Sequence, residues 1–246
     1  MSSDTLYEHP LNEQVRVYLR LEHLLNQLDQ AGEMLSPHDA YVFFKSLFDL
    51  MEILEQVQIK GDLAKDLDKL KIKLENWAGV PGVDRERLDI LITRTAQLQQ
   101  SLLQSPRLGQ SLKADKFLSG IRQRFNIPGG TCSFDLPILH HWQSLPLVQR
   151  QSDTQRWQDS LRSLKNALGL WLSITRESVG PISSNVRNGF FQQDIENASL
   201  LRIFISPEHQ CYPLISAHKS RFAMRFMPFD ETVEVAENMA LKIAIC

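Results

Sequence analysis

The sequence predicts an α+β protein, with an N-terminal helical bundle region followed by a C-terminal antiparallel β-rich domain. Two observations carry this prediction. Long Leu-rich segments without internal Gly or Pro fill the first two thirds, whereas short β-rich runs separated by turn residues follow Gly180-Pro181. The 246 residues suffice for one large domain or two smaller ones. We divide them into a mainly helical region, 1–126, and a mixed region, 127–246.

The first helices have clear start signals. A Leu-rich segment from Leu11 to Gln30 is uninterrupted by Gly or Pro and predicts one helix. Ser36-Pro37 then supplies an N-cap residue followed by proline at the first helical position, which predicts a second helix running to about Gln58. The apolar residues of this second segment cover more than one face, so we expect it to be largely buried.

Two apolar seams with heptad-like spacing run through the helical part. Leu63, Leu67, Leu70, Leu74 and Trp77 are spaced 4, 3, 4 and 3 apart. The same spacing recurs in a second set, which lies within a predicted long helix of about 152–178: Trp157, Leu161, Leu164, Leu168 and Trp171. The two seams predict helices packed as a bundle, and either one could instead face a second subunit.

Further elements follow from turn residues and β-rich runs. Helices are expected at about 84–104 and 108–125, and Ile127–Phe134, with its Gly129-Gly130 pair, interrupts the helical pattern. Antiparallel strands are expected over about 183–246, at the following runs: 186–192, 201–205, 212–215, 221–227 and 240–245.

Composition excludes several classes of function. The net charge of −2 argues against broad nucleic-acid binding. No stretch approaches 18 apolar residues and the first 12 residues contain no targeting signal, so we expect a cytoplasmic protein without a membrane span. Cys132, Cys211 and Cys246 are widely separated and lack metal-ligand or disulfide spacing, which favours reduced thiols.

Catalytic and metal-binding patterns are not found. The sequence contains no GxSxG, no phosphate-binding GxxxxGK[ST] and no GxGxxG after a strand. The adjacent pair His140-His141 diverges on either a helix or a strand, so it is poorly placed to share a metal. We therefore expect no enzyme, no cofactor and no metal. One alternative is an uncharacterised enzyme with a site at His140, His141 and the Gly129-Gly130 loop.

One segment combines positive charge with period-2 spacing. If residues 218–226 form a strand, Lys219, Arg221 and Arg225 project from one face. The other face then carries the residues expected to pack on the core: His218, Phe222, Met224 and Phe226. A row of like charges costs stability unless an anion or acidic peptide neutralises it, and Arg is suited to carboxylates. The spacing leaves open both a binding face and a merely solvated one.

A second basic pair lies on the first predicted helix. Arg16 and Arg20 are four residues apart and therefore share one side of that helix. They could contact an anionic partner, or they could form ion pairs with Glu13 and other nearby acids.

Five segments carry a resemblance to a known family: Tyr7–Glu13, Trp77–Asp84, Ser105–Gly109, Ile127–Pro137 and Tyr212–Pro228. Through them, the chain resembles the ZapD family of cell division proteins over nearly its whole length. The last of these segments is the most distinctive, and the loop from Glu231 to Ala240 is the main departure.

The resemblance implies a partner and a mechanism. It implies a cytoplasmic homodimer, recruited to the division site at midcell, that binds the C-terminal tail of FtsZ through basic residues and cross-links FtsZ protofilaments. Carried onto this chain, the basic site comprises Lys219, Arg221 and Arg225, with His140, Lys116 and Arg16 as further contacts. The alternative that we retain is a nucleic-acid-binding module that uses the basic strand 218–226.

Overall fold

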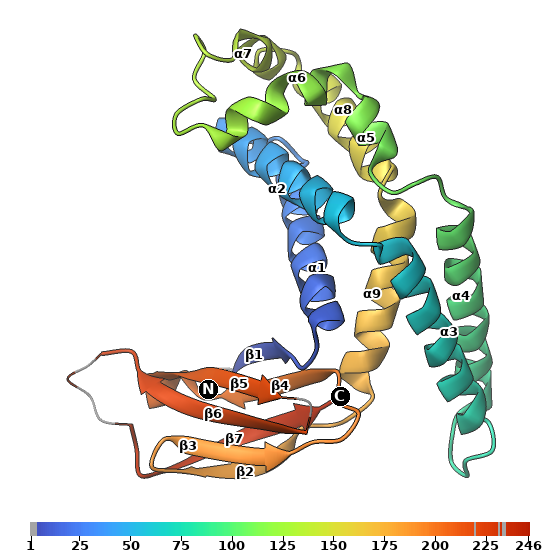
Figure 1. Ribbon diagram of the computed structural model, residues 1–246, viewed down its shortest axis with the longest axis vertical. Coiled ribbons are helices and arrows are strands. Elements are labelled where there is room, and N and C mark those ends of the chain that lie inside the picture. The colour runs from blue at the N-terminus through green and yellow to red at the C-terminus, as the bar shows by residue number, and fades with distance from the viewer. Residues whose placement is uncertain (1–3, 219, 231, 233–234) are drawn as a thin grey trace. The chain divides into compact units, whose positions relative to one another are not determined.

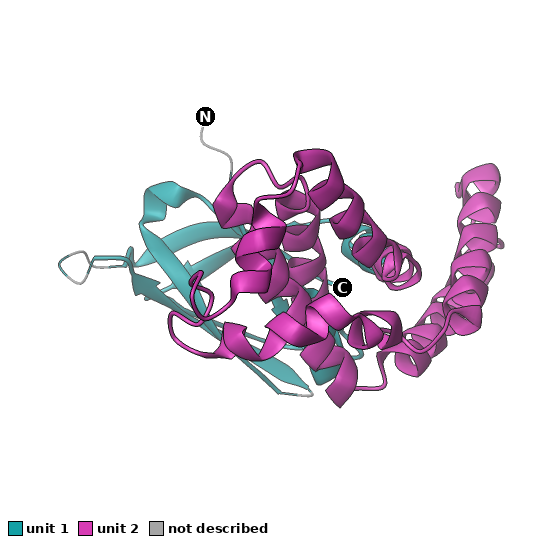
Figure 2. Cartoon of the chain, turned by 90° about the horizontal axis from the view of Figure 1, so that it is seen from above, with its two compact units in different colours: residues 1–19, 172–246 teal, residues 20–171 magenta. Residues whose placement is uncertain are grey.

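The computed structural model describes residues 4–218, 220–230, 232 and 235–246. These residues form two units, one of residues 1–19 with 172–246 and the other of residues 20–171 (Figure 2). The helices α1 and α9 contribute to both units, because the unit boundaries fall within them. Among the described residues, no helix is long and apolar enough to cross a lipid bilayer.

Apart from β1 at the start of the chain, the strands follow the α-helices, which confirms the predicted α+β class (Figure 1). The helices are α1 (Glu13–Ala31), α2 (Pro37–Gln56), α3 (Ile59–Trp77), α4 (Arg85–Gln104), α5 (Gln110–Ala114), α6 (Lys116–Arg122), the 3-10 helix η1 (Gln123–Asn126), α7 (Pro137–Gln143), α8 (Leu147–Asp159), α9 (Arg162–Glu177) and the 3-10 helix η2 (Pro207–His209). The strands are β1 (Thr5–Pro10), β2 (Ile182–Arg187), β3 (Phe190–Asp194), β4 (Leu200–Ile205), β5 (Cys211–His218), β6 (Arg221–Pro228) and β7 (Asn238–Ile245).

The division of the structure differs from the boundary predicted at residues 126 and 127. Aromatic residues of α6, η1, α7 and α8 pack around Phe44 of α2, and residues 127–171 belong to the unit of residues 20–171. Conversely, β1 joins the sheet by pairing with β4, which lies near the other end of the chain. A boundary drawn from local composition cannot register such a long-range pairing.

The start of α2 follows the local signal. The Ser36 side chain accepts a hydrogen bond from the Asp39 backbone N–H at 3.3 Å, and the Asp39 carboxylate accepts one from the Ser36 N–H at 2.7 Å. This reciprocal capping box, with Pro37 at the first helical position, satisfies backbone donors that the helix leaves unpaired. The predicted N-terminus at Ser36-Pro37 is confirmed.

The first apolar seam, on α3, packs against α4 of the same chain. Leu63, Leu67, Leu70 and Leu74 are all buried, and α4 lies along α3 (Figure 1). From α4, Leu88 and Leu102 are buried in the same hairpin. The four α3 leucines are therefore not available to a second subunit.

The second seam is also buried, but its helix is not continuous. α8 ends at Asp159 and α9 begins at Arg162, so the single long helix predicted over 152–178 is wrong. The Ser160 hydroxyl donates to the Trp157 carbonyl at 2.7 Å, and the Leu161 N–H donates to the Gln158 carbonyl, three residues back rather than four. Because these bonds compete with the regular α-helical ladder, the helix is interrupted while its apolar spacing continues.

A cluster of aromatic rings lies in the core of the 20–171 unit. Phe44 is fully buried, and its ring lies 5.1–6.2 Å from the centroids of six others: Phe43, Phe48, Phe117, Phe125, Trp142 and Trp157. These rings come from α2, α6, η1, α7 and α8. Phe44 of α2 therefore packs against α6, η1, α7 and α8. Edge-to-face and tilted ring pairs of this kind add to the stabilisation that burial provides.

The sheet of the other unit has seven strands among the described residues, in the order β1-β4-β7-β2-β3-β6-β5, with every neighbouring pair antiparallel. One face carries the core, which includes Val186, Ile203, Phe222 and Leu241. Asn188 and Gly189, both at positive φ, form the two-residue turn between β2 and β3. β1 was not predicted from the sequence.

Candidate functional site

The predicted basic strand is a hairpin rather than one strand. β5 ends at His218 and β6 begins at Arg221, and these two residues are direct cross-strand partners. Directly opposed residues project from the same face, so His218 lies with Arg221 and not, as predicted, with the apolar side chains. The predicted alternation within β6 is confirmed, since Phe222 is buried whereas Arg225 is exposed. Lys219 lies outside the described residues.

The outward sides of β3, β6 and β5, opposite the core, make one continuous surface that we call the β6 face. Four cross-strand rows compose it: Tyr212 with Met227; Leu214 with Arg225 and Phe190; Ser216 with Ala223 and Gln192; and His218 with Arg221 and Asp194. Ala223 and Met227 are half-buried and the other nine side chains are exposed. The face thus changes from apolar at one end, through small and polar side chains, to charged at the other.

Arg221 already has a partner at the charged end. Its Nε lies 2.7 Å from Oδ1 of Asp194, the residue directly opposite on β3. The hydrogen bond and the attraction from Asp194 raise the pKa of Arg221 above its usual value. Asp194 was not predicted as part of the site, because the sequence does not reveal the register between β3 and β6. Both side chains are more than half exposed, so solvent screens the pair.

Arg225 lies between two apolar side chains. Phe190 on β3 and Leu214 on β5 are its direct cross-strand partners, and they are 48% and 52% exposed. In the described part of the chain, no carboxylate forms an ion pair with Arg225. The row therefore presents a guanidinium, with five hydrogen-bond donors, between apolar neighbours.

Arg16 belongs to the same unit as the β6 face but lies on α1. Its Nε is 3.2 Å from Oε1 of Glu13, so the ion-pair alternative considered for this arginine is present in the structure. Burial lowers the pKa of His9, and the nearby positive charge of Arg16 lowers it further.

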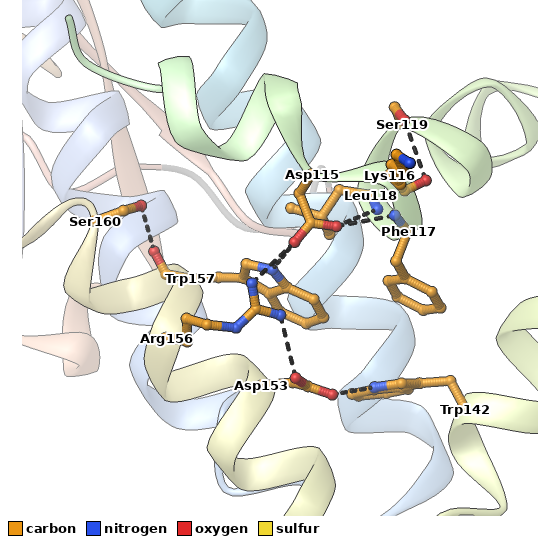
Figure 3. A network of polar contacts seen from close by, with 10 residues as sticks. All are labelled: Asp115, Lys116, Phe117, Leu118, Ser119, Trp142, Asp153, Arg156, Trp157 and Ser160. Carbon is orange, nitrogen blue, oxygen red and sulfur yellow. Dashed lines mark hydrogen bonds and ion pairs between the residues drawn. The ribbon is translucent and has the colours of Figure 1, made fainter. Parts of the chain in front are cut away.

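Lys116 begins α6, directly after the residue that caps this helix. The Asp115 carboxylate accepts hydrogen bonds from the backbone N–H groups of Phe117 and Leu118 at 2.9 and 3.0 Å, and from the indole N–H of Trp157 at 2.9 Å (Figure 3). Since Trp157 lies on α8, this carboxylate fixes the first turn of α6 against α8. Lys116 is thereby held at a fixed helix start, where its side chain is exposed.

A second carboxylate fixes the helix that carries His140. Asp153 on α8 accepts from the Trp142 indole N–H of α7 at 3.0 Å, and from Arg156 at 3.2 Å (Figure 3). Arg156 also donates to Asp115 at 3.1 Å, so one guanidinium joins both carboxylates. His140 is exposed on α7. Lys116 and His140 both belong to the 20–171 unit, whereas the β6 face belongs to the other.

Known families account for almost the whole chain. It matches the family model "ZapD: Cell division protein" over residues 19–225, which is most of its length. The chain belongs to the ZapD family. It is 50% identical over 241 residues to the cell division protein ZapD of Photobacterium profundum, and 47% identical over 240 residues to those of Vibrio cholerae and Aliivibrio fischeri. Each alignment covers 98% of this chain and 97–98% of its relative.

Family membership assigns the chain a role in cell division and names no reaction. Within the described residues, no group of three or more His, Cys, Asp or Glu side chains could hold a metal ion. The Gly129-Gly130 pair forms a turn in which a Cβ at Gly130 would lie 2.5 Å from the Arg124 carbonyl. Packing therefore accounts for Gly130 without a bound phosphate.

Replacing Asp115 by asparagine should destabilise this ZapD-family protein in a pH-dependent way. Burial alone would raise the pKa of Asp115, but hydrogen bonds from Trp157, Leu118 and Arg156 outweigh it and lower that pKa. A carboxyl whose pKa is lowered by folding stabilises the protein above its unfolded value of about 4, and this contribution is lost as pH falls through the folded value. Asparagine still caps the helix, so we expect a loss of about 1–2 kcal/mol at pH 7.

Chemical denaturation at pH 7 and at pH 3 measures this effect. The difference between wild type and Asp115→Asn should shrink at the lower pH. Asp68→Asn, which removes the same charge from an exposed position on α3, should behave like wild type at both. A difference for Asp115→Asn that is unchanged between pH 7 and pH 3 would contradict the proposed role of its ionised form.

Proposed function

We propose that this chain binds the C-terminal tail of FtsZ on the β6 face and, as a homodimer, cross-links FtsZ protofilaments at the division site. The observation that carries the proposal is Arg225, an exposed guanidinium without a carboxylate partner among the described residues. The other side chains of the β6 face are mostly exposed as well, so a peptide can contact them. Arginine binds carboxylates with two parallel hydrogen bonds, so an acidic tail is a suitable ligand.

Further basic residues are proposed as tail contacts on the family resemblance. Lys219 adjoins the β6 face in sequence, and Arg16 belongs to the same unit. Lys116 and His140 lie on the other unit, where the carboxylates of Asp115 and Asp153 fix their helices. We propose that these residues add to the attraction of an acidic tail rather than carry out catalysis.

Cross-linking requires two sites in one particle. A single tail-binding site would decorate a filament, whereas a homodimer can bridge two filaments, and many bridges along a lattice act together through avidity. Individual sites can then be weak and salt-sensitive. Because both predicted seams are buried within the chain, we propose that the homodimer forms through other surfaces. The chain then acts in the cytoplasm and is recruited to midcell by the filaments themselves.

Sedimentation of FtsZ polymers tests this function. At a centrifugal force that pellets bundles but not single filaments, the chain should bring full-length FtsZ into the pellet and remain soluble with FtsZ that lacks its C-terminal tail. Equal pelleting of both forms of FtsZ would exclude the tail as the binding partner.

Duplex DNA serves as a second probe, since the alternative function, nucleic-acid binding, predicts that the chain binds it. The structure gives that alternative less support, because 218–226 is not one basic strand and Arg221 is paired with Asp194.

Asp194 should compete with the tail for Arg221. Its carboxylate occupies the position on Arg221 that a tail carboxylate would take, so Asp194→Asn should free the guanidinium and strengthen tail binding by up to about fivefold. Fluorescence anisotropy of a labelled tail peptide measures the dissociation constant. Glu196→Gln, which removes the same charge two residues later, is the matched control and should change binding less. Weaker binding by Asp194→Asn would show that Asp194 supports the site instead.

A further inference from the structure

The row at Arg225 contains more than a charge. Phe190 and Leu214 are its direct neighbours on the two adjacent strands, and opposed side chains in antiparallel pairs have Cβ atoms about 4.5–5.5 Å apart. Tyr212, two residues before Leu214 on the same side of β5, extends the apolar area and is 39% exposed. The guanidinium is therefore bordered by apolar side chains on both sides.

These apolar side chains are not needed for the core of their own unit. Phe191, the neighbour of Phe190, points the other way and stacks on the buried Phe222 with ring centroids 6.0 Å apart. Leu214 likewise alternates with Ile215, which packs against the same core. Each strand thus supplies one apolar residue to the core and presents a second one outward, next to Arg225.

We propose that Phe190, Leu214 and Arg225 together form a mixed site for an extended acidic peptide that carries an apolar side chain close to its carboxylate. This inference rests on the proposed function and specifies the chemistry of the tail segment that binds. The choice of an acidic occupant follows from charge, since the described residues offer Arg225 no carboxylate. The apolar requirement follows from its two neighbours, which lose contact with water only when a partner covers them.

The third row of the β6 face, between the rows of Arg225 and Arg221, favours the same occupant. Ala223 lies between Gln192 and Ser216, so the surface next to Arg225 carries a small side chain flanked by polar ones. An extended peptide can approach closely over such a row, and successive side chains at about 3.4 Å per residue can reach the apolar and charged rows on either side. Arg225 would then bind the carboxylate while Phe190 and Leu214 shield these hydrogen bonds from water.

The two components of the site should respond differently to salt. Contacts between charges weaken as salt increases, whereas apolar contacts do not. Phe190→Ser and Leu214→Ser should each weaken binding of a fluorescein-labelled FtsZ tail peptide about tenfold at every salt concentration, with the salt dependence unchanged. Arg225→Ala should instead weaken binding most at low salt and flatten the salt dependence.

A matched variant and a matched peptide complete the experiment. Ile182→Ser removes an exposed apolar side chain from β2, outside the β6 face, and should bind like wild type. A tail peptide whose apolar residues are replaced by serine should bind wild type weakly and should lose little more on Phe190→Ser. Thermal unfolding checks that every variant is folded, and Leu214→Ser supplies an independent test if Phe190→Ser is not.

The outcomes separate this inference from the proposed function. If the arginine variant loses binding while folded Phe190→Ser and Leu214→Ser both bind like wild type, the apolar component is wrong and the tail site stands. If the arginine variant also binds like wild type, the proposed tail site itself is wrong. Equal binding of the native and the serine-substituted peptides would likewise overturn the apolar component.

Discussion

Replacing Arg225 by glutamate should weaken binding of the FtsZ tail about 100-fold and reduce bundling of FtsZ polymers to the level seen without the chain. The substitution removes charge-assisted hydrogen bonds to a carboxylate and adds repulsion between like charges. Arg225 is exposed on β6 and forms no ion pair among the described residues, so the fold should tolerate the change. Anisotropy with a tail peptide and sedimentation with FtsZ polymers measure the two effects.

A control on the same sheet separates local from general charge effects. Lys242→Glu makes the same change of charge on β7, outside the β6 face. The Nζ of Lys242 lies 3.3 Å from a carboxylate oxygen of Asp4. We expect this variant to retain most tail binding, and both variants to unfold at nearly the wild-type temperature. A folded Arg225→Glu protein that pellets FtsZ as well as wild type does would contradict the assignment of the site.

Of the substitutions predicted here, Phe44→Ala should cause the largest loss in the free energy of unfolding. The side chain is fully buried, and its ring contacts aromatic residues from several helices of the 20–171 unit. Truncating a buried phenylalanine removes its transfer free energy and leaves a cavity that rigid aromatic neighbours cannot easily fill, a cost of about 3–5 kcal/mol. Calorimetry should show the melting temperature lowered by roughly 10 °C.

Phe134 provides the matched control. This phenylalanine is 83% exposed, so Phe134→Ala should change the free energy of unfolding by less than about 0.5 kcal/mol. A melting temperature of Phe44→Ala within about 2 °C of wild type, a margin set from the usual shift per kcal/mol, would mean that the aromatic cluster does not hold these helices together.

The sequence predicted those parts of the fold that depend on local signals. The cap at Ser36 and the burial of Leu63 to Leu74 follow from hydrogen bonding and periodicity within a few residues. The break between α8 and α9 was not predicted, because the apolar spacing from Trp157 to Trp171 continues through it. β1 was also missed, since its pairing with β4 depends on contacts between the two ends of the chain.

The candidate site shows the same limit. Period-2 spacing correctly predicted that Arg221 and Arg225 project away from Phe222 and Met224. It placed His218 on the wrong side, because the hairpin between β5 and β6 resets the alternation. The neighbours of the two arginines, among them Asp194, come from other strands. Only the register of the sheet reveals them, so the mixed character of the site could not be read from the sequence.

Photo-crosslinking from the β6 face tests most directly where the tail binds. Ser216 is exposed on this face, in the row between those of Arg225 and Arg221. Ser216→p-benzoylphenylalanine therefore places a photoreactive group beside both arginines. The same group at Asn185, exposed on β2 outside the face, is the control. We predict that a labelled FtsZ tail peptide is crosslinked at position 216 and not at position 185. Crosslinking at position 185, or at neither position while the peptide remains bound, would contradict binding on the β6 face.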